Sequence, residues 1–139
     1  CLNLGGNYID DISALAGLKD LITLNLRNNK IEDIHALSNL TELRTLYLGF
    51  NQIREINALS GLANLWDLDL RSNPITDIGA LVNLSSLLCL DLSFNSTLDT
   101  SPGSPARTVI DTLMANGCQV IFDSAEDDGL PLDNQEKAW

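Results

Sequence analysis

The feature that most constrains this chain is a pattern of twenty-two residues that recurs five times. Leucine fills two neighbouring columns of the repeat, with one residue between them. Asparagine fills a third column, at Asn7, Asn29, Asn51, Asn73 and Asn95. A fixed period of about twenty to thirty residues indicates a solenoid, in which each repeat buries its apolar side against its neighbours. The sequence therefore predicts about five coils over residues 1–96.

The two halves of each repeat have different periodicities. The first half, L-x-x-L-x-L, alternates apolar and polar residues and predicts a short strand, so that stacked copies form a parallel sheet. The second half, as in EDIHALSNL, places apolar residues three apart, which favours a 3-10 turn on the outer side. The fold class predicted is α/β, a right-handed solenoid of strands and 3-10 turns.

Two polar columns have expected structural roles. We expect each asparagine to bond backbone groups of its own coil and the next one, because its side chain both donates and accepts. We expect the residues that follow the outer turn to adopt the left-handed conformation that ends a helical turn. These residues are Gly17, Asn39, Gly61 and Asn83.

Residues 97–123 depart from the repeat and predict a C-terminal capping coil made of a helix and a strand. Ser104 and Pro105 are suited to the cap and first position of a helix, and Gly117 to its end. Four apolar residues are expected on one face of this helix: Val109, Ile110, Leu113 and Met114. The segment CQVIFD then reads as a final strand.

The two ends of the chain lack the repeat's regularity. Residues 124–139 are acidic and pattern-free, so we interpret them as a linker or mobile end, with Trp139 as a candidate docking residue. The chain opens inside a repeat, at CLNLGGN, without a helical cap. We therefore expect it to be part of a longer protein, and its first strand could pair with another copy through an open edge.

The net charge of −11 argues against nucleic acid or an anionic membrane as partner, because both require a basic surface. No apolar run reaches the roughly 18 residues needed to span a bilayer, so membrane insertion is not expected. An acidic surface serves solubility in many proteins. It would also suit a basic partner, and the sequence leaves both interpretations open.

The three cysteines are predicted to be free thiols. Cys1 and Cys89 lie four repeats apart, which corresponds to roughly 19 Å at about 4.8 Å per strand and is too far for a disulfide. Aligning Val120 with Leu90 puts Cys118 and Cys89 on opposite faces of the sheet.

The pattern L-x-x-L-x-L-x-x-N-x-I-x-x-I-x-x-L-x-x-L resembles the leucine-rich repeat proteins, in particular the bacterial internalin-like class with twenty-two-residue repeats. Repeats such as LRTLYLGFNQIREINALSGLAN carry this resemblance over residues 1–96. It implies a horseshoe that presents a concave parallel sheet to a protein partner. It also favours a secreted or cell-surface location, although free cysteines are compatible with the cytoplasm.

With the leucines inward, alternation places a set of polar and aromatic side chains on the concave face. The candidate partner-binding residues are Arg27, Tyr47, Phe50, Asp67, Asp69, Arg71, Asp91 and Phe94. Exposed aromatic and arginine side chains are typical of binding hot spots. The alternative for Phe50 and Phe94 is that they tuck back as a spine at the strand ends. Trp66 is expected to pack at the sheet edge.

Asp69 and Asp91 are expected side by side on adjacent strands, where like charges favour a basic partner or a cation. Together with Asp67 they supply too few oxygen ligands for calcium on a flat sheet, so no metal site is predicted. As a concave-face residue, Asp69 is expected to be replaceable by alanine without a change in melting temperature.

Catalysis has little support in the sequence. The single histidine, His35, falls on the outer turn, and neither a nucleophile–histidine pair nor a phosphate-binding glycine motif occurs at usable spacing. We predict no enzyme activity and no cofactor. The sequence indicates a protein-interaction module, with carbohydrate or adhesin-type recognition and a structural spacer in a larger protein as alternatives.

Overall fold

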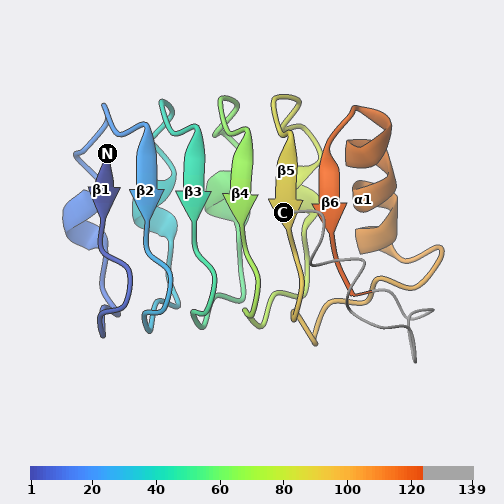
Figure 1. Cartoon of the computed structure of the whole chain (residues 1–139), viewed down its shortest axis with the longest axis horizontal. Coiled ribbons are helices and arrows are strands. Elements are labelled where there is room, and N and C mark those ends of the chain that lie inside the picture. The colour runs from blue at the N-terminus through green and yellow to red at the C-terminus, as the bar shows by residue number, and fades with distance from the viewer. Residues whose placement is uncertain (124–139) are drawn as a thin grey trace.

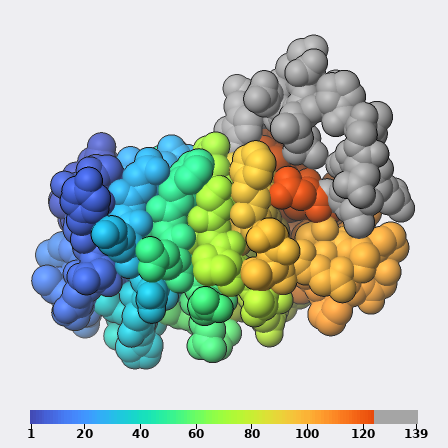
Figure 2. Space-filling view, turned by 90° about the horizontal axis from the view of Figure 1, so that it is seen from below, coloured from blue at the N-terminus to red at the C-terminus, as the bar shows by residue number. Residues whose placement is uncertain are grey.

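The computed structural model describes residues 1–123 as an open solenoid with one parallel sheet. Its six strands lie in sequence order and all point the same way (Figure 1). The strands are β1 (Leu2–Asn3), β2 (Thr23–Asn25), β3 (Thr45–Tyr47), β4 (Asp67–Asp69), β5 (Cys89–Asp91) and β6 (Gln119–Ile121). Successive coils form parallel slabs along the long axis (Figure 2). The predicted fold class is confirmed. Residues 124–139, interpreted above as a linker or mobile end, lie outside the described residues.

Four short 3-10 turns form the layer opposite the sheet. They are η1 (Ser13–Leu15), η2 (His35–Leu37), η3 (Asn57–Leu59) and η4 (Gly79–Leu81). The leucine and isoleucine columns meet between the two layers, and side chains such as Leu24, Leu46 and Ile53 are completely buried. Because this core is repeated rather than central, each strand and turn is placed mainly by its two neighbouring coils.

The register of the sheet follows the repeat. Leu24 pairs with Leu46 and Leu46 with Leu68, so strands that are twenty-two residues apart align without offset. At the last pair the spacing grows, and Leu90 pairs with Val120. The alignment used to separate Cys89 from Cys118 is therefore confirmed.

The asparagine column forms a ladder of buried hydrogen bonds. Asn51 Nδ2 donates to the carbonyl of Leu48 in its own coil at 2.9 Å and to that of Leu26 at 3.0 Å. Its Oδ1 accepts from the backbone N–H of Ile31 at 3.0 Å. Both Leu26 and Ile31 belong to the preceding coil, so the predicted bonding within one coil is confirmed and the predicted direction of the other bonds is wrong. The backbone at the end of the strand in one coil lies beside the asparagine of the following coil, so the asparagine bonds run back to the preceding coil.

Within the repeats, the left-handed residues lie at the corner that follows the strand, and the prediction for Gly17, Asn39, Gly61 and Asn83 is wrong. The 3-10 turns close with ordinary right-handed residues such as Ser38. The chain instead reverses sharply just after each strand, where positive φ angles recur at Gly6, Asn28, Phe50, Ser72 and Phe94. The tight bend at this corner of the coil demands the left-handed conformation, whatever the residue type.

Helix α1 (Pro105–Ala115) covers the end of the array beside β6 (Figure 1). Its start is as predicted, because Ser104 Oγ accepts a hydrogen bond from the backbone N–H of Arg107 at 3.1 Å. Gly117, with a φ of 92°, follows the helix end. Val109, Ile110 and Leu113 are buried, as expected. The expectation that Met114 shares this face is wrong, because Met114 lies in the last turn of the helix and is 50% exposed.

The three thiols differ in burial, which predicts their order of reaction. All three are free; Cys1 is exposed, Cys89 is half-buried, and Cys118 is buried. Burial, with a smaller contribution from the nearby Cys89, raises the pKa of Cys118 to about 11.

We expect an aromatic disulfide reagent at pH 8 to label Cys1 first and Cys118 only after unfolding, because the thiolate is the reacting form. Peptide mapping by mass spectrometry measures this order. Equal labelling rates of Cys1 and Cys118 in the native protein would contradict the burial.

Candidate functional site

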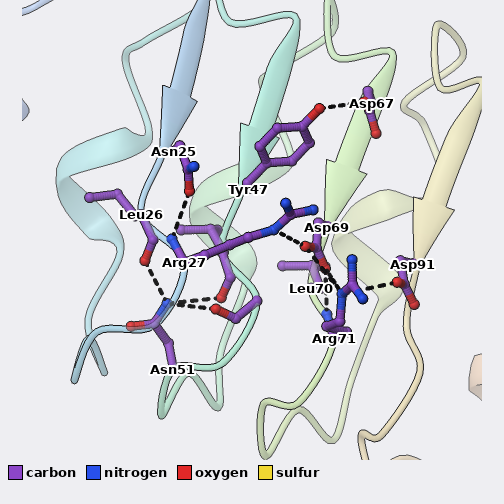
Figure 3. Close-up of polar contacts among 12 residues, drawn as sticks. Asn25, Leu26, Arg27, Tyr47, Asn51, Asp67, Asp69, Leu70, Arg71 and Asp91 are labelled. Carbon is purple, nitrogen blue, oxygen red and sulfur yellow. Dashed lines mark hydrogen bonds and ion pairs between the residues drawn. The ribbon is translucent and has the colours of Figure 1, made fainter. Parts of the chain in front are cut away.

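The concave face carries one connected polar network across strands β2 to β5 (Figure 3). Arg27 Nε binds Asp69 Oδ2 at 2.5 Å, although the two residues are two coils apart. Arg71 Nε lies 3.3 Å from Asp69 Oδ1 and 3.3 Å from Asp91 Oδ2. The four residues alternate in charge, so the network is neutral. We call Arg27, Asp69, Arg71 and Asp91 the Arg–Asp network.

The two carboxylates of this network are buried. Asp69 and Asp91 are 1% and 2% exposed, although both point to the sheet side that alternation predicted. Asp69 Oδ1 also accepts the backbone N–H of Arg71 at 3.0 Å. Asp91 Oδ1 accepts from the backbone N–H and the hydroxyl of Ser93. The arginines cover these oxygens, so the expected repulsion between neighbouring acids is offset.

Gly49 makes room for the network. A Cβ atom at this position would lie 2.9 Å from Asp69 Oδ2 and 3.1 Å from Arg71 Cγ. A larger residue here would therefore crowd the Asp69 carboxylate that Arg27 binds and would force that carboxylate to shift. The column thus alternates small and long residues, as Gly5, Arg27, Gly49 and Arg71.

Tyr47 is clamped between two neighbours. The guanidinium carbon of Arg27 lies 4.2 Å from its ring centre, within the range of a cation–π contact. Its hydroxyl donates to Asp67 Oδ2 at 3.0 Å. Partial burial, followed by the hydrogen bond to Asp67, raises the pKa of Tyr47 above its usual value. The ring is therefore held neutral and fixed in place on the sheet.

Phe50 and Phe94 stand at the corner after the strands and are 45% and 58% exposed. They do not form the buried spine that was one alternative. Both adopt left-handed backbone, with φ of 59° and 60°. This conformation costs an L-residue with a bulky side chain about 1 kcal/mol or more. Gly6 and Asn28 hold the same place in earlier coils, and both residue types tolerate it better.

Two other residues lie where the sequence placed them. Trp66 packs at the sheet edge, where its Nε1 donates to Thr45 Oγ1 at 3.2 Å and Arg44 lies 5.8 Å from its ring. It nevertheless stays 46% exposed. His35 is exposed on the outer turn.

Within residues 1–123, no group of three or more histidine, cysteine or acidic side chains is placed to hold a metal ion. No helix of the same region is long and apolar enough to cross a membrane.

Sequence reasoning found every member of the Arg–Asp network but missed how its members are joined. It treated Asp69 and Asp91 as exposed carboxylates and Arg27 as a separate contact. The alternation of glycine with arginine in one column is the available signal, because a long side chain beside a glycine has space to cross the next strand.

A comparison with family patterns identifies the class of this chain. The pattern described as Leucine Rich repeats (2 copies) matches residues 1–39 and 19–64. No curated protein sequence matches the chain. The chain belongs to the leucine-rich repeat proteins, whose fold commonly mediates protein–protein interaction and which are typically non-enzymatic.

Solved structures make the resemblance more specific. An internalin F of Listeria monocytogenes superposes with a TM-score of 0.76 at 36% identity, covering 87% of this chain and 34% of that one. Internalin C2 of the same species gives 0.74 at 29% identity, covering 98% and 57%. A leucine-rich repeat protein of Leptospira interrogans gives 0.75 at 27%, covering 87% and 30%. This chain therefore spans about a third to somewhat over half of these relatives, and its repeats are internalin-like.

Proposed function

We propose that this chain is a protein-interaction module that binds its partner through the concave face and the adjoining corner. Tyr47, Phe50 and Phe94 serve as anchors, and the Arg–Asp network holds the surface rigid. The observation that carries the proposal is the pair of exposed phenylalanines in left-handed backbone. Their position is energetically unfavourable for the free protein, and strained residues of this kind cluster at functional sites.

The Arg–Asp network supports the proposal through preorganisation. Arg27 and Arg71 lose little side-chain freedom on binding, because carboxylates with 1% and 2% exposure already fix them. A surface that is ordered before binding avoids part of the entropy cost of association. Asp69 and Asp91 act in this proposal as positioning residues beneath the arginines, whereas Asp67, which is only partly buried, is available for contact.

Recognition of a carbohydrate through Tyr47 is less favoured by the geometry. One face of the ring is covered by Arg27 at 4.2 Å, so it is not open for stacking on a sugar. The half-exposed Phe50 and Phe94 lack a polar group of their own, which suits apolar side chains of a protein better than sugar hydroxyls.

The decisive variant is the double change Phe50→Asn and Phe94→Asn, tested by capture from host and target-cell extracts with mass spectrometry. We expect the captured partner to be lost, because two central apolar anchors disappear. Stability should stay within about 1 kcal/mol at each position. The loss of a half-buried ring, about 1 kcal/mol, is offset by a similar relief of left-handed strain.

The control is a pair of changes on the outer face, His35→Ala and Gln52→Ala, where both side chains are exposed. This variant should capture the same partner as the unchanged protein. If the phenylalanine variant keeps the partner while the outer-face variant loses it, the interaction surface is on the outer side and the proposal is wrong.

A further inference from the structure

The Arg27 side chain is held by two contacts, and a third fixes its backbone. Its Nε binds Asp69, its guanidinium lies on the ring of Tyr47, and its backbone N–H donates to Asn25 Oδ1 at 3.0 Å. The two side-chain contacts use the Nε side and one flat face of the guanidinium. Figure 3 shows the side chain reaching across β3 with its two terminal nitrogens directed away from the Asp69 carboxylate.

The two terminal nitrogens of Arg27 have no hydrogen-bond acceptor within residues 1–123. Every buried side-chain nitrogen and oxygen in that region has a partner, so these two nitrogens reach solvent. The side chain as a whole is 30% exposed. A fixed guanidinium with two parallel N–H groups facing outward matches the two oxygens of a carboxylate.

The charges around Arg27 are arranged unevenly on the concave face. The outward residues of β1, β2 and β3 and of the positions just after them include no acid; they are Cys1, Asn3, Gly5, Thr23, Asn25, Arg27, Thr45, Tyr47 and Gly49. The acids lie on β4 and β5. Two of them, Asp69 and Asp91, are buried and shared with Arg71, and Asp67 accepts the hydroxyl of Tyr47.

We propose that the outward edge of Arg27 binds a carboxylate of the partner, an aspartate or glutamate side chain, so that the partner is acidic at this point of the interface. This inference rests on the proposed function and names the chemistry of one contact within it. It differs from the basic partner that the neighbouring Asp69 and Asp91 suggested, because these two acids are covered. The net charge of −11 slows the approach of an acidic partner, but salt screens that repulsion beyond about 8 Å. A phosphate dianion is disfavoured by the nearby carboxylates.

The test uses N-acetylglutamate amide as a probe, with N-acetylglutamine amide as its neutral counterpart, at constant ionic strength. Binding is followed by the Nε–H signals of the arginines in nitrogen-15 NMR spectra. We expect Arg27 to bind the glutamate probe about tenfold more tightly than the glutamine probe, because charge-assisted hydrogen bonds are the stronger ones. Arg54, exposed on the outer side, is the internal control and should show a far weaker response.

Two variants sharpen the result. Arg27→Lys keeps the charge but loses the paired donors, so the affinity for the glutamate probe should fall about fivefold or more. Asp67→Asn keeps an acceptor for Tyr47 but removes a negative charge, so the affinity should rise about twofold or more. Melting temperatures of both variants check that the fold is retained.

Several outcomes overturn the inference. These are an equal response of Arg27 and Arg54, equal binding of the two probes, weaker binding after Asp67→Asn, and tighter binding of inorganic phosphate than of the glutamate probe. Because no partner protein is present, such a failure leaves the capture experiment on Phe50 and Phe94 unaffected. The carboxylate contact and the interaction module are thus judged separately.

Discussion

Replacing Asn51 by alanine is expected to lower the free energy of unfolding by about 3–5 kcal/mol. The side chain satisfies the carbonyls of Leu26 and Leu48 and the backbone N–H of Ile31, all away from solvent. Alanine can replace none of these bonds, and each buried group left unpaired costs about 1–3 kcal/mol. Domains are stable by only about 5–15 kcal/mol, so the loss is a large share of the total.

Urea unfolding followed by circular dichroism measures this change. Asn57→Ala in the same coil is the matched control, because Asn57 is exposed and its side chain makes no hydrogen bond within residues 1–123. Its effect should stay within about 0.5 kcal/mol. Asn7→Ala should fall between the two, since Asn7 bonds only carbonyls of its own coil. Similar losses for Asn51→Ala and Asn57→Ala would show that the ladder does not stabilise the solenoid.

The repeat predicted the features that depend on local periodicity. The alternation of apolar and polar residues placed Leu24 and Leu46 inward and Tyr47 outward, and the constant spacing set the register of Leu46 with Leu68. One face of each strand is buried, so a shift of one residue would turn every leucine to solvent. The direction of the side chains and the register follow from the sequence, because the burial of the leucines alone decides both.

The left-handed corner could not be located in this way, because its residue types are mixed. Gly17 and Asn39 are favourable left-handed residues, yet neither has a positive φ angle after its 3-10 turn. Phe50 and Phe94 are unfavourable ones, yet they occupy the corner. Here the geometry of the closed coil overrides residue preference. Gly6 and Asn28 could have indicated a left-handed position in this column, but Phe50 and Phe94 in the same column argue against it.

The Arg–Asp network also lay beyond sequence reasoning. Arg27 and Asp69 are forty-two residues apart, and their contact depends on one side-chain conformation and on the absence of a Cβ at Gly49. Alternation gives the direction of a side chain from the sheet but not what covers it. Asp69 therefore points outward as predicted and is nevertheless buried.

Replacing Asp69 by alanine is accordingly expected to destabilise the protein by about 3 kcal/mol, in contrast to the unchanged melting temperature that alternation alone predicts. Removing one partner of a buried ion pair typically costs about 3–5 kcal/mol, because the remaining charges lose their counterion. Arg27 and Arg71 are 30% and 28% exposed and can turn towards water, which places the cost at the lower end. The backbone N–H of Arg71 also loses its acceptor.

Asp67→Ala is the matched control, since Asp67 lies on the same strand, is only partly buried and accepts one side-chain hydrogen bond. Its cost should not exceed about 1 kcal/mol. A double-mutant cycle of Arg27→Ala with Asp69→Ala then isolates their coupling, which should exceed that of an exposed ion pair and persist at high salt. If Asp69→Ala costs no more than Asp67→Ala and the coupling with Arg27 vanishes, Asp69 is a surface carboxylate. Arg27 would then have no fixed position from which to bind a partner's carboxylate.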